Sequence, residues 1–145
     1  MPYTEQFSEV HALLDKMVVS GGVAEANSGY NSLAKYHRAV IIIVPLSIAS
    51  TFNVDIEVAE DAAGTHAHTL KSITQMTAAD NGGVVQIEIR GEELANPTGA
   101  SGSNYDFINV EVTPAGGAAT YVVLLYGIEP RYAEVDQSLL TEVVA

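Results

Sequence analysis

Two histidines spaced two residues apart, His66 and His68 in the segment THAHTL, have the type and spacing that could bind a metal ion. On a β-strand, the side chains of residues i and i+2 point to the same face, and two neutral imidazoles there can bind a metal ion. A catalytic zinc site needs three protein ligands and an open fourth position. The pair supplies two, and nothing in the spacing of His11 or His37 connects them to it. We therefore expect no metal, no cofactor and no catalytic residue here, but a partly exposed strand or loop after the turn DAAG.

Other patterns that carry chemistry in known enzymes are missing from the sequence. It contains no G-x-S-x-G nucleophile elbow, no phosphate-binding loop with its lysine and no H-E-x-x-H zinc motif. The carboxylates Asp55, Glu57, Glu60 and Asp61 lack the dense, turned spacing of a calcium loop. We interpret them as a solvated strand face followed by a turn, and we expect a protein that is not an enzyme.

Acidic residues greatly outnumber basic ones: 18 Asp and Glu against 6 Lys and Arg give a net charge of −12. Phosphate backbones and anionic membranes repel such a surface, so neither nucleic acid nor a membrane is expected as a partner. The bases Arg38, Arg90 and Arg131 could anchor ion pairs at an interface. More often such arginines neutralise acids on their own subunit, and that is the expectation here.

Neither a disulfide nor a targeting segment is expected. The sequence has no cysteine, which fits a reducing compartment. The first base is Lys16, so no positively charged region stands at the start. The most apolar run, AVIIIVPLSIA at 39–49, is shorter than the roughly 20 residues of a membrane helix, and we interpret it as a core strand.

Residues 1–32 are predicted to form a helix and an arm. One face of a helix over residues 1–20 would carry Phe7, Val10, Leu14 and Met17, and the glycine pair that follows would end it. The stretch GGVAEANSGYNS, residues 21–32, is small and polar and is predicted to be a loop or an extended arm.

Residues 33–129 carry the pattern of β-strands separated by glycine-rich turns. The segments TFNVDIEVAE, VVQIEIRG and FINVEVTP alternate apolar and polar residues, as half-buried strands do. The segments AVIIIV and ATYVVLLYGI are apolar on both faces, so these strands should be central or covered twice. Turn signals such as DNGG and TPAGGA lie between the strands. The sequence therefore predicts a mainly β protein: an antiparallel β-sandwich or jelly-roll-like barrel with a short N-terminal helix and a C-terminal extension. Four aliphatic side chains are predicted to be buried in its core, namely Ile42, Ile56, Ile89 and Leu124.

Residues 130–145 are predicted to be a C-terminal arm that leaves the sheet at Pro130, so that the chain is one domain with an arm at each end. The apolar residues Leu139, Leu140, Val143 and Val144 form a patch on a segment too short to bury it. The arms either dock on a neighbour or fold back on their own sandwich, and docking is the expectation. Deleting residues 1–20 is then expected to leave a soluble β protein that no longer assembles.

The order of these segments resembles the small virion structural proteins of tailed bacteriophages, of the head decoration or cement type. The resemblance covers residues 5–133 and is carried by patterns of strands and turns. Within it, a recurrent E-I-x-x-x-E-L-like stretch is matched by Glu88, Ile89 and Leu94. The closing strand and its exit are matched by Tyr126, Pro130, Arg131 and Tyr132.

The resemblance implies a virion structural protein that decorates and stabilises a capsid on its exterior, after synthesis in the cytoplasm of the host bacterium. It implies a β-sandwich that forms an oligomer, with a homotrimer expected, and it makes the major capsid protein the expected partner. The residues expected to contact a sister subunit or the capsid are Phe7, Val10, Leu14, Arg131, Tyr132, Leu139, Leu140 and Val143.

Two other classes of protein stay open at this point. A carbohydrate- or host-surface-binding β module, as on phage fibres, would have to use the 7 tyrosines in place of the tryptophan that the sequence lacks. A cupin-like metal-dependent enzyme would need more ligands than His66 and His68 provide. Metal analysis of the purified protein tests the enzyme, and a glycan array tests the binding module.

Overall fold

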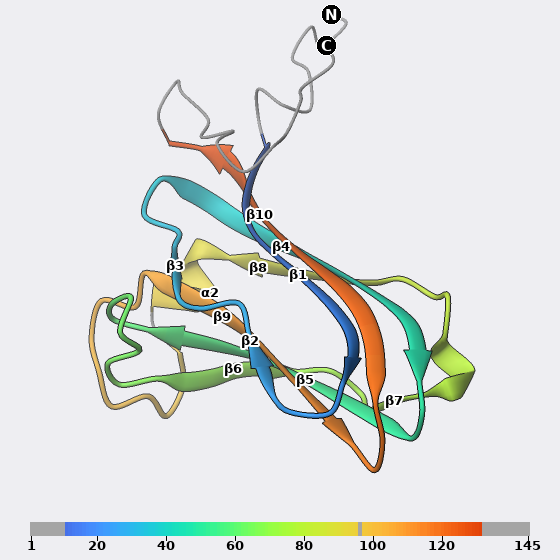
Figure 1. The fold of residues 1–145 in the computed structure, drawn as a ribbon. Helices are drawn as coiled ribbons and strands as arrows, with labels where there is room; N and C mark the ends of the chain where they lie inside the picture. Colours follow the sequence, from blue (N-terminus) through green and yellow to red (C-terminus); the bar gives the residue numbers. More distant parts are fainter. Residues whose placement is uncertain (1–10, 96, 132–145) are drawn as a thin grey trace, which may run out of the picture.

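Antiparallel strands make up most of residues 11–95 and 97–131, the part of the chain that the computed structural model describes (Figure 1). The strands are β1 (His11–Gly22), β2 (Ala26–Asn27), β3 (Asn31–Ser32), β4 (Tyr36–Ile48), β5 (Thr51–Ala59), β6 (His68–Ser72), β7 (Met76–Thr77), β8 (Val85–Arg90), β9 (Phe107–Ala115) and β10 (Ala119–Pro130). The helical elements described are the 3₁₀ turn η1 (Ala78–Asp80) and the helix α2 (Gly91–Ala95). No helix in these residues is long and apolar enough to cross a membrane.

The strands form two sheets whose inner faces meet. The four-stranded sheet has the order β1-β10-β4-β8, and the six-stranded sheet has the order β2-β9-β5-β6, with β3 also on β9 and β7 also on β5. If β2 with β3, and β6 with β7, are each counted as one interrupted strand, eight strands remain, and they pass between the sheets in the order of a jelly roll. The prediction of a mainly β, antiparallel sandwich is confirmed, and its jelly-roll form follows from the strand order.

The alternation in the sequence matches the two faces of the six-stranded sheet. In β5, the side chains of Phe52, Val54, Ile56 and Val58 are all buried, while the residues between them are half-exposed. In β9, Ile108, Val110 and Val112 are buried in the same way. Because successive side chains of a strand point to opposite faces, one strand can pack a core and meet water at the same time.

The two doubly apolar segments are the central strands of the four-stranded sheet, as predicted. β10 lies between β1 and β4, and β4 lies between β10 and β8. The prediction of their inward face is wrong, however, because Ile42 and Leu124 are half-exposed and face outward as a cross-strand pair. Their neighbours along the strands, Ile41, Ile43, Val123 and Leu125, fill the core instead. A run that is apolar at every position does not reveal which alternate residues point inward.

The prediction of an N-terminal helix is wrong for residues 11–20, because they lie in β1. The first ten residues lie outside the described part of the chain. β1 pairs with β10 from His11 to Gly22, with a register shift between Leu13 and Asp15. A bulge of this kind inserts an extra residue and breaks the period of two. Met17 is buried in the core as a result of the strand pairing, not of a helical stripe.

Residues 26–32 are not a free arm, because β2 and β3 pair with β9 at the edge of the six-stranded sheet. The side chain of Asn109 holds this segment in place. Its amide Nδ2 donates to Asn27 Oδ1 at 2.7 Å and to Glu57 Oε2 at 3.0 Å, and its Oδ1 accepts from the Gly29 N–H at 3.1 Å. Asn109 alternates with the inward-facing Ile108 and Val110, but only 1% of it is exposed because this segment covers it. A buried amide with all these partners satisfied does not destabilise the fold.

One buried polar group in the core has no partner among the described residues. The side chain of Tyr121 is fully buried, its ring lies edge-on to Phe52 with centroids 4.9 Å apart, and its hydroxyl forms no hydrogen bond. Burial raises the pKa of this phenol above its ordinary value. The hydroxyl therefore contributes the cost of desolvation without a compensating hydrogen bond.

Replacing Tyr121 with phenylalanine should raise the free energy of unfolding by about 1 kcal/mol, since it removes an unsatisfied hydroxyl and keeps the ring. Urea denaturation measures the change. Tyr105→Phe is the matched control, because the Tyr105 hydroxyl donates to the His66 carbonyl at 3.1 Å and accepts from the Gly102 N–H at 2.8 Å. That variant should lose about 1 kcal/mol. Equal losses in both variants would mean that Tyr121 has a partner after all.

Candidate functional site

The two histidines of THAHTL do not lie on one strand. His66 sits in the turn between β5 and β6 with a left-handed backbone (φ 53°), and His68 is the first residue of β6, opposite Val58. The geometry that would place residues i and i+2 on one face therefore does not apply to them. His66 Nδ1 instead lies 2.7 Å from Glu60 Oε2. No group of three His, Asp or Glu side chains within residues 11–95 and 97–131 could hold a metal ion.

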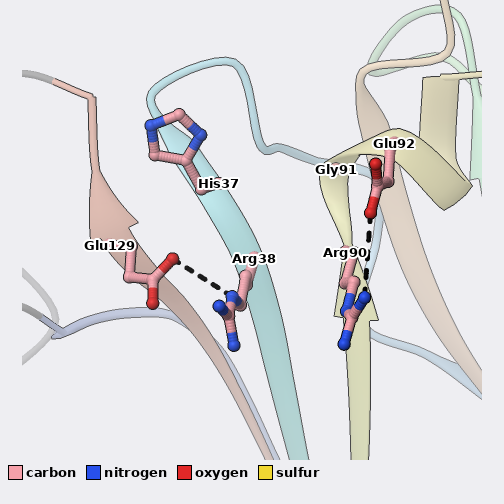
Figure 2. Close-up of a pocket in the computed structure, with 6 residues that line it drawn as sticks. All are labelled: His37, Arg38, Arg90, Gly91, Glu92 and Glu129. Carbon is pink, nitrogen blue, oxygen red and sulfur yellow. Dashed lines mark ion pairs between the residues drawn. The ribbon is translucent and has the colours of Figure 1, made fainter.

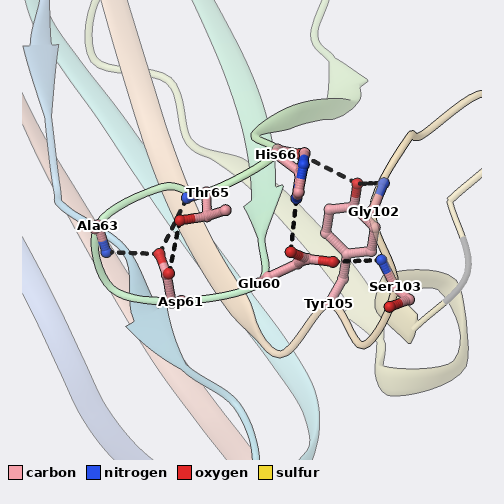
Figure 3. A network of polar contacts seen from close by, with 8 residues as sticks. All are labelled: Glu60, Asp61, Ala63, Thr65, His66, Gly102, Ser103 and Tyr105. Atoms are coloured by element: carbon pink, nitrogen blue, oxygen red, sulfur yellow. Dashed lines mark hydrogen bonds and ion pairs between the residues drawn. The ribbon is translucent and has the colours of Figure 1, made fainter.

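Glu60 connects two loops that are far apart in the sequence (Figure 3). Its carboxylate accepts a hydrogen bond from His66 and another from the backbone N–H of Ser103. These two bonds, that of His66 first, hold the pKa of Glu60 below its ordinary value. The hydroxyl of Tyr105 adds a further link to this loop pair through its bond to the His66 carbonyl.

Asp61 closes the turn that presents His66. Its carboxylate accepts from the Thr65 hydroxyl at 2.6 Å, from the Thr65 N–H at 3.0 Å and from the Ala63 N–H at 2.9 Å (Figure 3). These bonds, with the Thr65 hydroxyl as the largest cause, lower the pKa of Asp61. Glu60 and Asp61 thus hold the conformation of residues 59–68, AEDAAGTHAH, through hydrogen bonds within the protein.

A polar pocket of about 360 Å³ lies where the start of β4 meets the ends of β8 and β10 (Figure 2). Its lining residues are His37, Arg38, Arg90, Gly91, Glu92 and Glu129. We call it the arginine pocket. Two arginines and two glutamates share its lining.

The arginines of this region are paired within their own chain. Arg38 bridges Glu88 at 2.9 Å and Glu129 at 3.1 Å, whereas Arg90 reaches Glu92 only at 3.8 Å and keeps 63% of its side chain exposed. Arg131 donates from Nε to the Tyr36 carbonyl at 3.2 Å. Neutralisation of local acids is thus observed for Arg38 and Arg90, as expected from the sequence.

The outer face of the four-stranded sheet is apolar along its centre. Three cross-strand pairs make up this centre: Val44 with Val122, Ile42 with Leu124, and Val40 with Tyr126. All six side chains are half-exposed, and they alternate with the buried core residues of the same strands. Val18, which lies opposite Val122 on β1, is 73% exposed. We call the surface formed by these seven residues the apolar outer face.

A shallow groove of about 210 Å³ lies on this face. It is lined by His11, Val40, Ile42, Gln86, Tyr126 and Ile128. The apolar surface continues toward the other end of the sheet, where Leu46 is 52% exposed. A soluble single chain seldom shows so continuous an apolar surface unless something binds there.

The outer face of the six-stranded sheet is acidic by contrast. Asp55 and Glu111 lie directly opposite each other on β5 and β9, and Glu57 is two residues along from Asp55. The Tyr30 hydroxyl donates to Glu57 at 2.7 Å. Burial and then this hydrogen bond raise the pKa of Tyr30 well above its ordinary value. Burial, followed by the charge of Glu57, raises the pKa of Glu111.

Replacing Glu111 with glutamine should stabilise the protein at neutral pH. The pKa of Glu111 is raised in the folded state. The side chain therefore contributes most to the free energy of unfolding when the pH is below its ordinary pKa of 4.5, and this contribution is lost as the pH rises through the folded-state pKa. Like charges opposite each other in a sheet cost roughly 0.2–1 kcal/mol, which sets the expected gain at pH 7. Thermal melts between pH 3 and 8 measure it. The gain should vanish at the acidic end, and Glu88→Gln, beside Arg38, should show no gain at any pH. A gain that persists at pH 3 contradicts the electrostatic cause.

Two of the eight contact residues predicted from the sequence lie within the described part of the chain. Leu14 lies in β1, half-buried and packed against the core, and Arg131 lies just beyond β10. The remaining six lie outside the described residues: Phe7, Val10, Tyr132, Leu139, Leu140 and Val143. The apolar outer face was not predicted as a surface, although the doubly apolar segments AVIIIV and ATYVVLLYGI were its signal.

No protein-family model matches the sequence, and no curated protein is similar to it at a significant level. Among solved structures, the chain is similar to a subunit of the disulfide-linked pili of Bacillus endospore appendages, with 8% identity, 88% of this chain and 98% of that chain covered, and a TM-score of 0.41. It is similar to a chain of the full particle of Israeli acute paralysis virus heated to 63 degrees, with 10% identity, 94% and 81% covered, and a TM-score of 0.44. A chain of the native virion of Kashmir bee virus at neutral pH gives 10% identity, 96% and 81% covered, and a TM-score of 0.43. At these values the similarity is too distant to support a functional argument.

Proposed function

We propose that the chain is a virion structural protein that decorates and stabilises the capsid of a tailed bacteriophage from the outside, as an oligomer. The observation that carries the proposal is the apolar outer face on a sandwich whose interior is filled by its own side chains. A surface of this kind becomes stable in water when another protein covers it. The net charge of −12 keeps the rest of the subunit soluble until it assembles.

The jelly roll itself does not choose between the candidate functions. Viral capsid proteins, lectins and cupins all use it, so the choice depends on the sites that the fold carries. The space between the sheets holds packed side chains such as Phe52, Tyr121 and Ile41, each fully buried. A cupin-like metal enzyme needs at least three protein ligands for its metal, and no such group of side chains is found among the described residues.

The carbohydrate-binding alternative has less support than the structural role. Sugar sites in β modules rely on aromatic rings that stack on the sugar, and the sequence has no tryptophan. Tyr36, Tyr105 and Tyr121 are buried, so their rings cannot stack on a ligand from solvent, and Tyr30 and Tyr126 are half-exposed. A glycan array with the purified protein tests this alternative directly.

The finer parts of the proposal follow the resemblance to decoration proteins. The partner is the major capsid protein, the oligomer is a homotrimer, and the protein is made in the host bacterium's cytoplasm before it binds the shell. Closed cyclic symmetry is the usual form of homo-oligomers, which agrees with a trimer.

Co-sedimentation with assembled phage heads that lack the chain tests the proposed function. We expect saturable binding at a fixed number of copies per head and a higher temperature of head disruption once the sites are filled. The double variant His66→Ala, His68→Ala should bind equally well, because neither histidine takes part. A protein that stays in the supernatant at all concentrations contradicts the capsid role. Stoichiometric zinc in the wild type that is lost in the double variant would favour the enzyme alternative.

A further inference from the structure

The apolar outer face has the properties of a binding surface for an extended segment. Its apolar residues lie in line along β4 and β10, the central strands of the four-stranded sheet. The groove of about 210 Å³ follows this line between Tyr126, Val40 and Ile42. Substituting its most exposed residue, Val18, does not disturb the core, because 73% of Val18 is exposed to solvent.

Basic side chains border this face. Lys16 lies opposite Leu124 on β1, and Arg38 and Arg90 lie opposite each other on β4 and β8. These three are half of the 6 bases in the chain. Arg38 is already paired with Glu88 and Glu129, and Arg90 with Glu92, so the border is close to neutral. The outer face of the six-stranded sheet, with Asp55, Glu57 and Glu111, has the opposite charge.

The C-terminal segment, residues 132–145 (YAEVDQSLLTEVVA), has the matching chemistry. It contains the acids Glu134, Asp136 and Glu142 and no base, together with the apolar residues Val135, Leu139, Leu140, Val143 and Val144. An acidic and apolar segment is repelled by the acidic sheet, whereas the apolar face with its near-neutral border does not repel it. Fully extended, the 14 residues from 132 to 145 would reach about 46 Å, and the 12 residues of β10 span about 40 Å. The segment is therefore long enough to cover the face.

The lack of turn-forming residues after β10 favours a neighbouring copy as the source of this segment. Pro130 still pairs with Tyr36, and the Arg131 N–H donates to the Lys35 carbonyl at 2.7 Å. The chain bends at Arg131, and Glu129 just before it has a left-handed backbone (φ 54°). Residues 132–145 contain neither glycine nor proline, the residues that most favour a further tight turn back onto the same sheet.

We infer that the apolar outer face binds the C-terminal segment, residues 132–145, of a neighbouring copy of this chain. The inference rests on the self-association in the proposed function, but not on the capsid. Leu139, Leu140, Val143 and Val144 supply the apolar contacts to the pairs along β4 and β10. Glu134, Asp136 and Glu142 face the border formed by Lys16, Arg38 and Arg90.

Sedimentation velocity of the full chain and three variants provides the first test. The full chain should form a closed oligomer. Deletion of residues 132–145 and the substitution Leu124→Lys should each give folded monomers, with the fold checked by circular dichroism. Thr113→Lys is the matched control, because it adds the same charge to the outer face of the six-stranded sheet, where Thr113 is half-exposed opposite Asn53. It should assemble like the wild type. If Leu124→Lys fails to fold, Val18→Lys replaces it.

Binding of a labelled peptide of residues 132–145 to the protein truncated at Arg131 provides the second test. The peptide should bind, at least tenfold more weakly when the truncated protein also carries Leu124→Lys or Val18→Lys, and equally well with Thr113→Lys. A monomeric full chain together with a peptide that binds would mean that the segment covers the face of its own chain, which overturns the inference. A truncated protein that still forms the oligomer also overturns it. Co-sedimentation with heads is independent of both results, so a failure here is distinguishable from a failure of the capsid role.

Discussion

Replacing Ile56 with alanine should lower the free energy of unfolding by about 2–5 kcal/mol, the usual cost of truncating a large aliphatic side chain in a core. Ile56 is fully buried at the centre of β5, between Val110 on β9 and Lys71 on β6. The cavity left by the truncation cannot close easily, because strands on both sides and the opposite sheet hold the surrounding side chains in place. A loss of this size should lower the melting temperature by at least roughly 4 °C.

Ile42→Ala is the control of the same residue type. Ile42 is half-exposed on the apolar outer face, so its truncation removes less buried surface and leaves no enclosed cavity. We expect a smaller loss from it, measured by the same denaturation experiment. If Ile56→Ala melts within about one degree of the wild type, the inward face of residues 52–58 has been assigned wrongly.

Deletion of residues 1–20 should destroy the native sandwich, in contrast to the expectation drawn from the sequence. The deletion removes residues 11–20 of β1, including the buried side chains of Ala12, Leu13 and Met17. It also leaves β10 as an unpaired edge strand that is apolar along its length, which promotes aggregation. The total stability of a domain of this size is about 5–15 kcal/mol, and the loss of an entire strand is of that order.

Deletion of residues 1–10 is the appropriate comparison, because it keeps every residue of β1. We expect this shorter deletion to remain soluble, with the circular dichroism spectrum of a β protein, while the longer deletion is insoluble or unfolded. Soluble, cooperatively melting protein after deletion of residues 1–20 would show that β1 is dispensable. In that case the four-stranded sheet would have to be stable with three strands.

Much of the fold could be predicted because its strands have one wet face and one dry face. The alternation around Ile56 and Ile89 identified β5 and β8 and their inward residues correctly. The same rule failed for Ile42 and Leu124. Both faces of β4 and β10 are apolar, so hydrophobicity does not show which alternate residues point inward. The rule failed for β1 because a bulge near Asp15 interrupts the period, so that the apolar residues imitate a helical stripe.

The polar sites were harder to predict because their partners are distant in the sequence. Glu60 binds the Ser103 N–H, 43 residues away, and Arg38 binds Glu88, 50 residues away. The expected partly exposed strand or loop after DAAG is confirmed, but the contact of His66 with Glu60 was not predicted. The turn that holds His66 in a left-handed conformation places it against Glu60, and no pattern of residue types within THAHTL reveals that turn.

The position of β10 between β1 and β4 also determines when this protein can fold in a cell. The ribosome makes β1 first, yet its partner in the sheet is the last strand of the described chain. Until β10 has left the ribosome, β1 has no neighbour and β4 lacks one of its two. Such distant pairings are slow to form and expose apolar strands while they wait. The sandwich is therefore completed only after translation has passed Pro130, and nascent chains that stall earlier are candidates for chaperones rather than for assembly.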